Sequence, residues 1–160
     1  MYPTAPSTMR PMERALGDRE PVVIATDGSQ GAEAAVDAGA RVARTIGTSA
    51  VLVYVRPSLG PLGDPYYQEK LTEQMAYARD ALSRARELLA QEGIDGEEEI
   101  LEGSAADRIV ELARARNAPL IVVGSRGLGA IAGALLGSVS SGIIHRADRP
   151  VLVVPSPESR

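Results

Sequence analysis

Short aliphatic runs alternate along this chain with longer stretches that carry apolar residues at helical spacing. The aliphatic runs predict strands at residues 22–25, 50–55, 120–123 and 151–154, and a further strand is predicted at residues 97–102. The stretches between them predict helices at residues 30–46, 66–92, 104–116 and 138–146. Unbroken aliphatic runs are typical of strands that are buried on both faces of a sheet. Because strands that alternate with amphipathic helices indicate a parallel sheet joined by right-handed crossovers, the pattern predicts a doubly wound α/β fold with helices on both faces.

Capping signals and glycines mark the ends of the predicted helices. Ser29 can cap the first helix, and Gly47 can end it. Ser104, with Asp107 three residues later, fits a capping box at the third helix. Helical spacing predicts two buried faces: Ala35, Val36, Ala40, Ala43 and Ile46 on the first helix, and Leu71, Met75, Ala78, Leu82, Ala85 and Leu88 on the second.

The strand at residues 97–102 differs from the others because it begins with Glu97, Glu98 and Glu99. Charge on a strand discourages unwanted pairing, so this strand is predicted to lie at an edge of the sheet. The same acidic cluster could in principle hold a metal, but a solvated edge is the preferred interpretation. The last strand, 151–154, is uncharged and would need a partner if it also lies at an edge.

Composition argues against several classes of function. The chain has 160 residues, which fits one domain. Its net charge of −4 argues against nucleic acid or an anionic membrane as the main partner, because both need a basic patch. It contains no cysteine, which excludes disulfides and thiol chemistry. No segment resembles a signal peptide or reaches the length of a membrane span, so we expect a cytoplasmic protein.

The predicted domain does not fill the whole chain. Residues 1–20 are rich in proline, serine, threonine and charge, which is typical of a disordered tail. Order is expected from residue 21 to residue 156, and residues 157–160 form a short C-terminal tail.

A glycine pattern follows the fourth predicted strand. Gly124, Gly127, Gly137 and Ser138 are spaced G-x-x-G-(nine residues)-G-S, directly after the run at 120–123. Glycines let the backbone come close to an anionic ligand. A Gly-Ser pair at the start of a helix adds free N–H groups, a hydroxyl and the positive end of the helix dipole. The pattern therefore predicts a phosphate cradle and a nucleotide ligand.

Asp27 ends the first predicted strand, as Gly124 ends the fourth. In doubly wound folds, ligands bind outside the carboxyl ends of the strands, where the winding reverses. We therefore expect both residues at one site. Asp27 can also cap the turn into the first helix, and the two roles are compatible.

Motifs for catalysis are missing from the sequence. There is no G-x-x-x-x-G-K-[S/T] motif, and no G-x-G-x-x-G follows the first strand. Ser138 and Ser140 lack the G-x-S-x-G context of a hydrolase nucleophile, so they are interpreted as phosphate ligands. His145, the only histidine, is interpreted as a helix-end residue.

These residues together resemble a universal stress protein of the ATP-binding kind, over residues 21–155. The most specific part is the glycine motif, which reads G-x-x-G-x9-G-[S/T] in that family. The resemblance implies a five-stranded sheet of order 3-2-1-4-5. It implies adenosine contacts from Ala25, Thr26, Asp27 and the backbone of Val55. It implies a phosphate site formed by Gly124, Ser125, Arg126, Gly127, Gly129, Gly137, Ser138, Val139 and Ser140.

The resemblance also implies ATP as the ligand, with Mg or Mn coordinated by the phosphate oxygens. It implies a homodimer through Val151, Leu152, Val153 and Val154, for which the uncharged strand gives a physical reason. The Arg126 guanidinium could reach a phosphate or face water. The preferred hypothesis is a nucleotide-dependent regulatory module of the stress response. The alternatives are a slow ATPase or adenylate-transferring enzyme, and a structural stress protein with an empty pocket.

Overall fold

The computed structural model describes residues 20–129, 133 and 135–157. The predicted N-terminal tail therefore lies, apart from Glu20, outside the described residues, and so do residues 158–160 of the predicted C-terminal tail.

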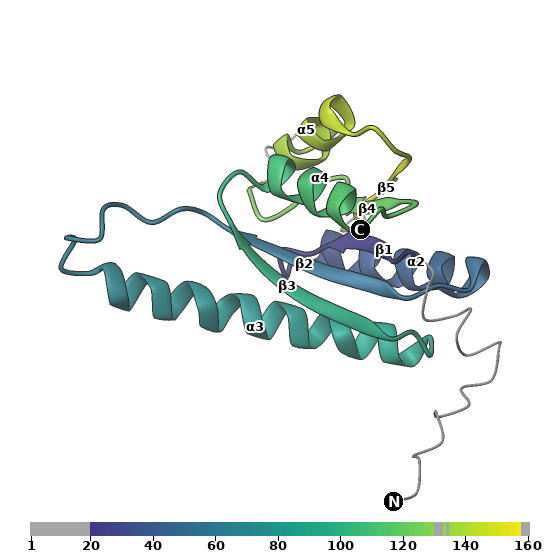
Figure 1. Ribbon diagram of the computed structural model, residues 1–160, viewed down its shortest axis with the longest axis horizontal. Coiled ribbons are helices and arrows are strands. Elements are labelled where there is room, and N and C mark those ends of the chain that lie inside the picture. The colour runs from purple at the N-terminus through teal and green to yellow at the C-terminus, as the bar shows by residue number, and fades with distance from the viewer. Residues whose placement is uncertain (1–19, 130–132, 134, 158–160) are drawn as a thin grey trace, which may run out of the picture.

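One parallel sheet forms the centre of the described structure (Figure 1). Its strands are β1 (Val22–Ala25), β2 (Ala50–Arg56), β3 (Gly96–Glu102), β4 (Ile121–Gly124) and β5 (Val151–Val154). Their order across the sheet is β3-β2-β1-β4-β5, and every pair is parallel. The helices are α2 (Gln30–Ile46), α3 (Tyr67–Gln91), α4 (Ala105–Ala115) and α5 (Ser138–Arg146). The predicted fold class and strand order are confirmed.

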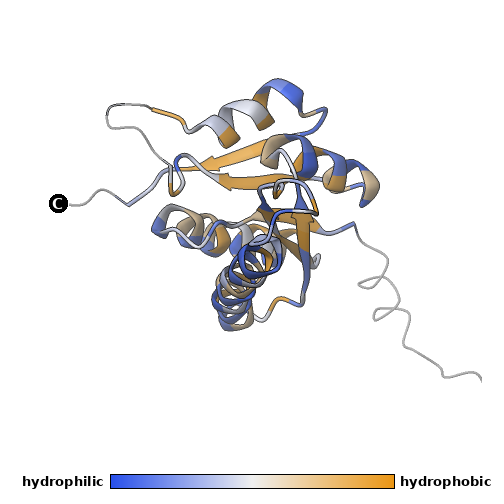
Figure 2. Cartoon of the chain, turned by 90° about the vertical axis from the view of Figure 1, so that its left-hand side faces the viewer, coloured by the Kyte–Doolittle hydropathy of each residue, from blue (hydrophilic) through white to orange (hydrophobic). Residues whose placement is uncertain are grey.

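Helices α2 and α3 cover one face of the sheet, and α4 and α5 cover the other. Strands β1, β2, β4 and β5 consist mainly of apolar residues, whereas β3 carries four glutamates, and the helices are hydrophilic on their outer sides (Figure 2). Because successive strand residues point to opposite faces, each face receives its own set of aliphatic side chains. Complete burial of each such side chain contributes about 1.5–3 kcal/mol.

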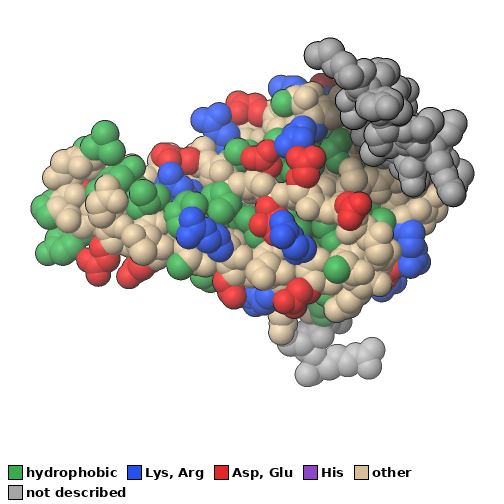
Figure 3. Space-filling view, turned by 60° about the horizontal axis from the view of Figure 1, so that its bottom comes forward, with side chains coloured by type: hydrophobic (Ala, Val, Ile, Leu, Met, Phe, Trp, Pro, Cys, Tyr) green, Lys and Arg blue, Asp and Glu red, His purple; other side chains and the backbone are tan. Residues whose placement is uncertain are grey.

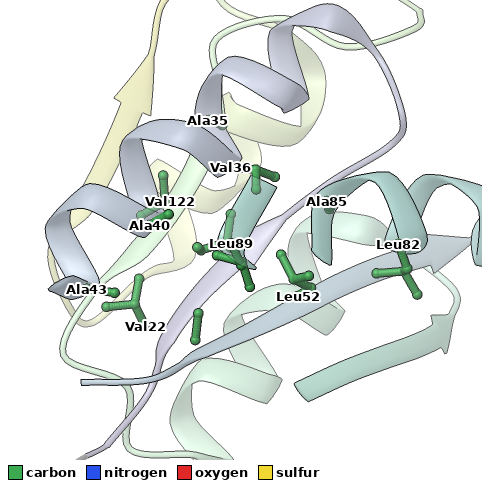
Figure 4. Packing of buried hydrophobic residues seen from close by; sticks show 12 residues of the cluster. Val22, Ala35, Val36, Ala40, Ala43, Leu52, Leu82, Ala85, Leu89 and Val122 are labelled. Carbon is green, nitrogen blue, oxygen red and sulfur yellow. The ribbon is translucent and has the colours of Figure 1, made fainter. Parts of the chain in front are cut away.

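The face under α2 and α3 packs closely because small helix residues meet large strand residues (Figure 4). Alanines of α2 lie beside Val22 and Val122, whereas Leu52 of β2 lies beside Ala85 and Leu82 of α3. A Cβ at Gly39 of α2 would lie 2.6 Å from Ile24 Cδ1, so any larger residue there would force the Ile24 side chain to move. The opposite core joins β1, β2 and β4 to α4 and α5 through Val23, Ala25, Val51, Val53, Ala106, Ile109, Val110, Ala113, Ala118, Ile121, Val123 and Ile143.

The predicted helix ends are partly correct. Ser29 Oγ accepts a hydrogen bond from Ala32 N at 3.2 Å, and Gly47 ends α2 with φ of 70°. Ser104 begins α4 but makes no side-chain cap bond. The capping-box prediction is wrong, because the Asp107 carboxylate pairs with Arg146 Nε at 2.7 Å.

The predicted helix faces shift at two places. Ile46 is 44% exposed, because the packed face of α2 ends one turn earlier, at Ala43. On α3 the buried residues are Ala78, Ala81, Leu82, Ala85 and Leu89, whereas Leu71, Met75 and Leu88 are only half-buried. The amino end of α3 extends past the sheet, so its first turns have little to pack against (Figure 1).

The loop between β2 and α3 lies beside this projecting end. Hydrophobic side chains gather there, while charges of both signs are spread over the rest of the visible face (Figure 3). Leu62 and Tyr66 are among the exposed apolar residues of this part of the chain.

The two edge strands of the sheet are β3 and β5. The predicted edge position of the glutamate-bearing strand is confirmed, since β3 is at one edge, and β5 is at the other. None of the helices in the described residues combines the length and the apolar composition that spanning a lipid bilayer requires.

Candidate functional site

A cavity of about 360 Å³ lies at the carboxyl ends of β1, β2 and β4. Of the predicted site residues it is lined by Ala25, Thr26, Asp27, Val55, Gly124, Arg126, Gly127, Gly129, Gly137, Ser138, Val139 and Ser140. It is also lined by Ala32, Val53, Ala105, Ile109, Val123, Leu128 and Leu136, which sequence reasoning missed. Most of these missed residues are ordinary apolar positions of strands and helices, so no local pattern distinguished them from the core.

The two ends of the cavity differ in chemistry. The β2 side is apolar, with Val53 and Val55 of β2 facing Ala105 and Ile109 of α4. The opposite side, beyond β1, is formed by the glycine residues after β4 and by the amino end of α5. An apolar slot joined to a polar cradle is typical of pockets for small organic anions.

Asp27 lies between these two ends and bridges two loops. Its Oδ1 accepts a hydrogen bond from Ser29 N at 3.0 Å, so the predicted role in the turn before α2 is confirmed. Its Oδ2 accepts a second bond from Leu128 N at 2.9 Å, across 101 residues of sequence. A Cβ at Gly127 would overlap Oδ2, so this approach requires glycine. A carboxylate has about four acceptor positions, so Asp27 can still accept bonds from a ligand.

Helix α3 supports Asp27 from behind. Tyr77 Oη donates a hydrogen bond to the Asp27 carbonyl at 3.2 Å. The Tyr77 ring also meets the Tyr54 ring, with centroids 6.0 Å apart. The pKa of Tyr54 is raised by burial first, and then by Tyr77 and Asp27 nearby. Tyr54 therefore keeps its phenolic proton at neutral pH.

The amino end of α5 points free N–H groups at the cavity. Gly137 is the N-cap, and the helix's first hydrogen bond runs from Ser141 N to Gly137 O at 3.0 Å. The amides of Ser138, Val139 and Ser140 therefore have no partner within the helix. The single hydrogen of the Ser140 hydroxyl is shared between Ser125 O at 3.0 Å and Gly137 O at 3.1 Å, so the backbone N–H of Ser140 is the group left for a ligand.

Ser125 is the one predicted site residue that does not line this cavity. Its side chain turns to the other side of the backbone, because Ser125 Oγ accepts a hydrogen bond from Ser156 N at 3.2 Å. There it lines a second hollow together with Val153, Pro155 and Ser156. The Ser125 side chain therefore faces away from the cavity, and the predicted contact of Ser125 with a phosphate stays a prediction.

Arg126 is half-buried and lines both the cavity and the second hollow. Among the described residues, no carboxylate forms an ion pair with its guanidinium. The described residues also hold no group of three or more metal-ligating side chains. Asp27 is the only carboxylate that the described residues contribute to the cavity lining, so a metal here would depend on ligand oxygens.

The fold and the cavity define a class: a doubly wound α/β protein with a cavity at the carboxyl ends of its strands, the place where such folds bind ligands. The profile described as the universal stress protein family matches residues 19–155, and the chain belongs to that family. A universal stress protein of Thermus aquaticus is 33% identical over 135 residues, which cover 83% of this chain and 96% of that protein.

Two solved structures show the same fold. The universal stress protein of Archaeoglobus fulgidus in complex with dAMP has 30% identity and a TM-score of 0.69, covering 85% of this chain and 98% of that one. A universal stress protein in complex with cAMP has 31% identity and a TM-score of 0.65, covering 86% and 98%. The family resemblance that the glycine motif indicated is confirmed.

Proposed function

We propose that this protein binds an adenine nucleotide, with ATP as its ligand, and acts as a nucleotide-dependent regulatory module. The observation that carries the proposal is the single cavity that joins an apolar slot, the Asp27 carboxylate and the amino end of α5. The relatives described as bound to dAMP and cAMP support the adenine nucleotide class.

The adenine edge fits the backbone at Val55. Strand β1 ends at Ala25, which is opposite Val53, and Thr26 N donates to Val53 O at 2.9 Å. On the other side of β2, Gly103 N donates to Arg56 O at 3.0 Å. Because backbone groups alternate sides along a strand, the N–H and C=O of Val55 face the β1 side, past the last residue paired there. One donor and one acceptor on this edge match the adenine amino group and ring nitrogen.

The phosphates fit the opposite end of the cavity. The free amides at the start of α5 and the positive end of its dipole favour an anion. Arg126 is available to a phosphate because its guanidinium pairs with none of the described carboxylates. Mg or Mn would be held through the phosphate oxygens, since Mg²⁺ keeps most of its ligands as water and phosphate.

Isothermal titration with ATP, after bound nucleotide has been measured by mass and absorbance, tests the proposal. A Cβ at Gly124 would lie 2.9 Å from the backbone oxygen of Gly31, which cannot move aside. Gly124→Ala and Gly127→Ala should therefore weaken ATP binding by at least about tenfold, which corresponds to about 1.4 kcal/mol. Gly60→Ala is the matched control, because a Cβ there meets nothing within 4 Å. Equal affinity in all variants would contradict the proposal.

Gly137 behaves differently from the other cradle glycines. A Cβ at Gly137 would lie 3.5 Å from Arg126 Cα and Ser125 O, which is ordinary contact. Gly137→Ala should therefore fold normally, so any loss of ATP binding would come from crowding of the ligand rather than from the fold.

Hydrolysis is the alternative function. Asp27 is the only acidic residue in the described cavity lining, and two amides already bond it, so binding without turnover is preferred. Phosphate release is measured in wild type and Asp27→Ala. Steady release that disappears in the variant while ATP binding survives would favour the slow ATPase.

The dimer forms through β5 in this proposal. Strand β5 is an uncharged edge strand whose residues are half-buried, so its outer edge can pair with a second copy. The regulatory readout is then the surface of a nucleotide-loaded dimer.

A further inference from the structure

We propose that Ser125 is a positioning residue, which sets the affinity for phosphate without touching the ligand. It joins the segment Gly124–Gly127 to the amino end of α5, and it ties both to the backbone after β5. The inference rests on the proposed function, because it concerns the affinity of the same cradle for phosphate.

The carbonyl of Ser125 fixes the two halves of the cradle relative to each other. It accepts a hydrogen bond from Gly137 N at 2.7 Å and another from Ser140 Oγ at 3.0 Å. A carbonyl oxygen has two lone pairs, so both are used by the first turn of α5. The free amides of that turn therefore keep one distance and one direction from Gly124 and Gly127.

The amide and hydroxyl of Ser125 hold the cradle against the C-terminal strand. Ser125 N donates to Val154 O at 2.8 Å, which continues the β4–β5 ladder by one residue. Ser125 Oγ accepts from Ser156 N at 3.2 Å. Ser125 is only 9% exposed, so water has little access to replace these bonds.

The backbone of α2 packs closely against Ser156 and Arg126, so these residues have little space in which to move. A Cβ at Gly31 of α2 would lie 2.6 Å from Ser156 Oγ and 2.7 Å from Arg126 O. The backbone of α2, the residues after β4 and Ser156 are thus in direct contact. A shift of Ser156 would be passed to Arg126, at the phosphate end of the cavity.

The adenosine end does not depend on these bonds. Val53 and Val55 belong to β2, and Ala105 and Ile109 belong to α4. None of the four hydrogen bonds of Ser125 involves either element. Loss of the Ser125 hydroxyl should therefore reduce the affinity for phosphate while the affinity for adenosine stays the same.

Calorimetric titration of ATP and of adenosine with the full chain tests this. Ser125→Ala removes only Oγ and keeps the backbone bonds. We expect ATP affinity to fall about three- to tenfold, as for one lost hydrogen bond, and adenosine affinity to change by less than about twofold. Val22→Ala is the control: it is fully buried at the opposite ends of the strands, and its loss of stability should not change the ATP-to-adenosine affinity ratio.

A second variant checks the partner of the hydroxyl. Ser156→Pro removes the N–H that Ser125 Oγ accepts. It should produce the same selective loss for ATP, and in the double variant the two losses should not add, because they remove one bond. Additive losses, or equal losses for ATP and adenosine in Ser125→Ala, would overturn the inference.

Failure of the inference can be told from failure of the proposed function. If wild type prefers ATP to adenosine and Ser125→Ala keeps the full preference, only the positioning role is overturned. If wild type binds neither ligand, or binds ATP no better than adenosine, the phosphate cradle itself is overturned.

Discussion

Both edges of the sheet are parallel strands with one unpaired side. Edge strand β3 carries charged side chains, whereas edge strand β5 carries only apolar ones. On β3, Arg116 bonds Glu97 and Glu99 at 2.8 Å each, and Arg86 pairs with Glu98 at 2.7 Å. Strand β5 has no charged side chain, and all of its residues are half-buried. Because charge on an edge strand discourages pairing, we expect β5 rather than β3 to accept another strand.

The open groups of β5 can be named. Ile121 N donates to Pro150 O at 3.1 Å, and Ser125 N donates to Val154 O at 2.8 Å, so the even-numbered positions face β4. The N–H and C=O groups of Val151 and Val153 therefore face outward. Leu135, which is 90% exposed, adds an apolar side chain to this part of the surface, near Val153.

The largest expected effect is on the β5 edge. Val153→Lys would place two like charges, one from each copy, in the proposed interface, at a cost of several kcal/mol. We expect the dissociation constant of the dimer to rise by at least about a hundredfold, which corresponds to about 2.8 kcal/mol. Analytical ultracentrifugation measures it. Glu98→Lys on the β3 edge is the matched control and should leave association unchanged. A wild-type protein that stays monomeric at high concentration would refute the dimer.

The opposite change, removal of charge from the β3 edge, should make that edge able to pair. Replacing Glu97 and Glu98 by valine would remove charge from both faces of the β3 edge, where Glu97 is 64% exposed. Without these charges β3 should pair with other copies, giving species larger than a dimer. Light scattering against concentration detects them. If the double variant keeps the wild-type size, the charges do not protect this edge.

A smaller effect concerns the bridge between β3 and α4. The pKa of Arg116 is raised by its hydrogen bonds to Glu99 and Glu97, so this guanidinium is always charged. Arg116→Ala should lower the free energy of unfolding by less than about 1 kcal/mol, because these side chains are about one third or more exposed and water screens them. Urea denaturation measures the change, which should shrink in 1 M salt, where the Debye length is about 3 Å. A larger loss that salt does not alter would indicate packing instead.

The smallest effect lies at the entrance to β5. A hydrogen bond from Arg149 is the main cause that lowers the pKa of Asp148 from 3.8 to about 2. Because the folded pKa lies below the unfolded one, this carboxylate contributes stability above about pH 4 and loses it as the pH falls through about 2. The stability difference between wild type and Asp148→Asn should therefore shrink across that window in acid urea titrations. If the stability difference between the two proteins does not change with pH, the ionised Asp148 carboxylate does not contribute to stability.

Local patterns predicted most of the fold because each depends on neighbouring residues. The charges of Glu97 to Glu99 were enough to place β3 at an edge, and Ser29 was enough to begin α2. The capping box at Ser104 was wrong because Arg146, far along the chain, takes the Asp107 carboxylate. The prediction that Ile46 is buried was wrong, because helical spacing does not tell where the packed face of a helix ends.

Part of the candidate site could also be predicted from local patterns. The glycine spacing pointed to Gly124, Gly127 and Gly137, and these residues do line one cavity with Asp27. The apolar slot was missed because Ala105 and Ile109 have no motif of their own. Ser125 was assigned to the ligand because it lies inside the motif, although its hydroxyl faces Ser156.

The sequence by itself determined the alternation of strands and helices, the charge on β3 and its absence from β5, and the glycine residues of the cradle. Those properties follow from periodicity and residue type, which are local. Only the tertiary structure decided that Asp27 meets Leu128 across 101 residues, and that Ser125 supports the cradle from behind. Such contacts depend on the register and order of parallel strands, which bring together backbone groups that no spacing in the sequence relates.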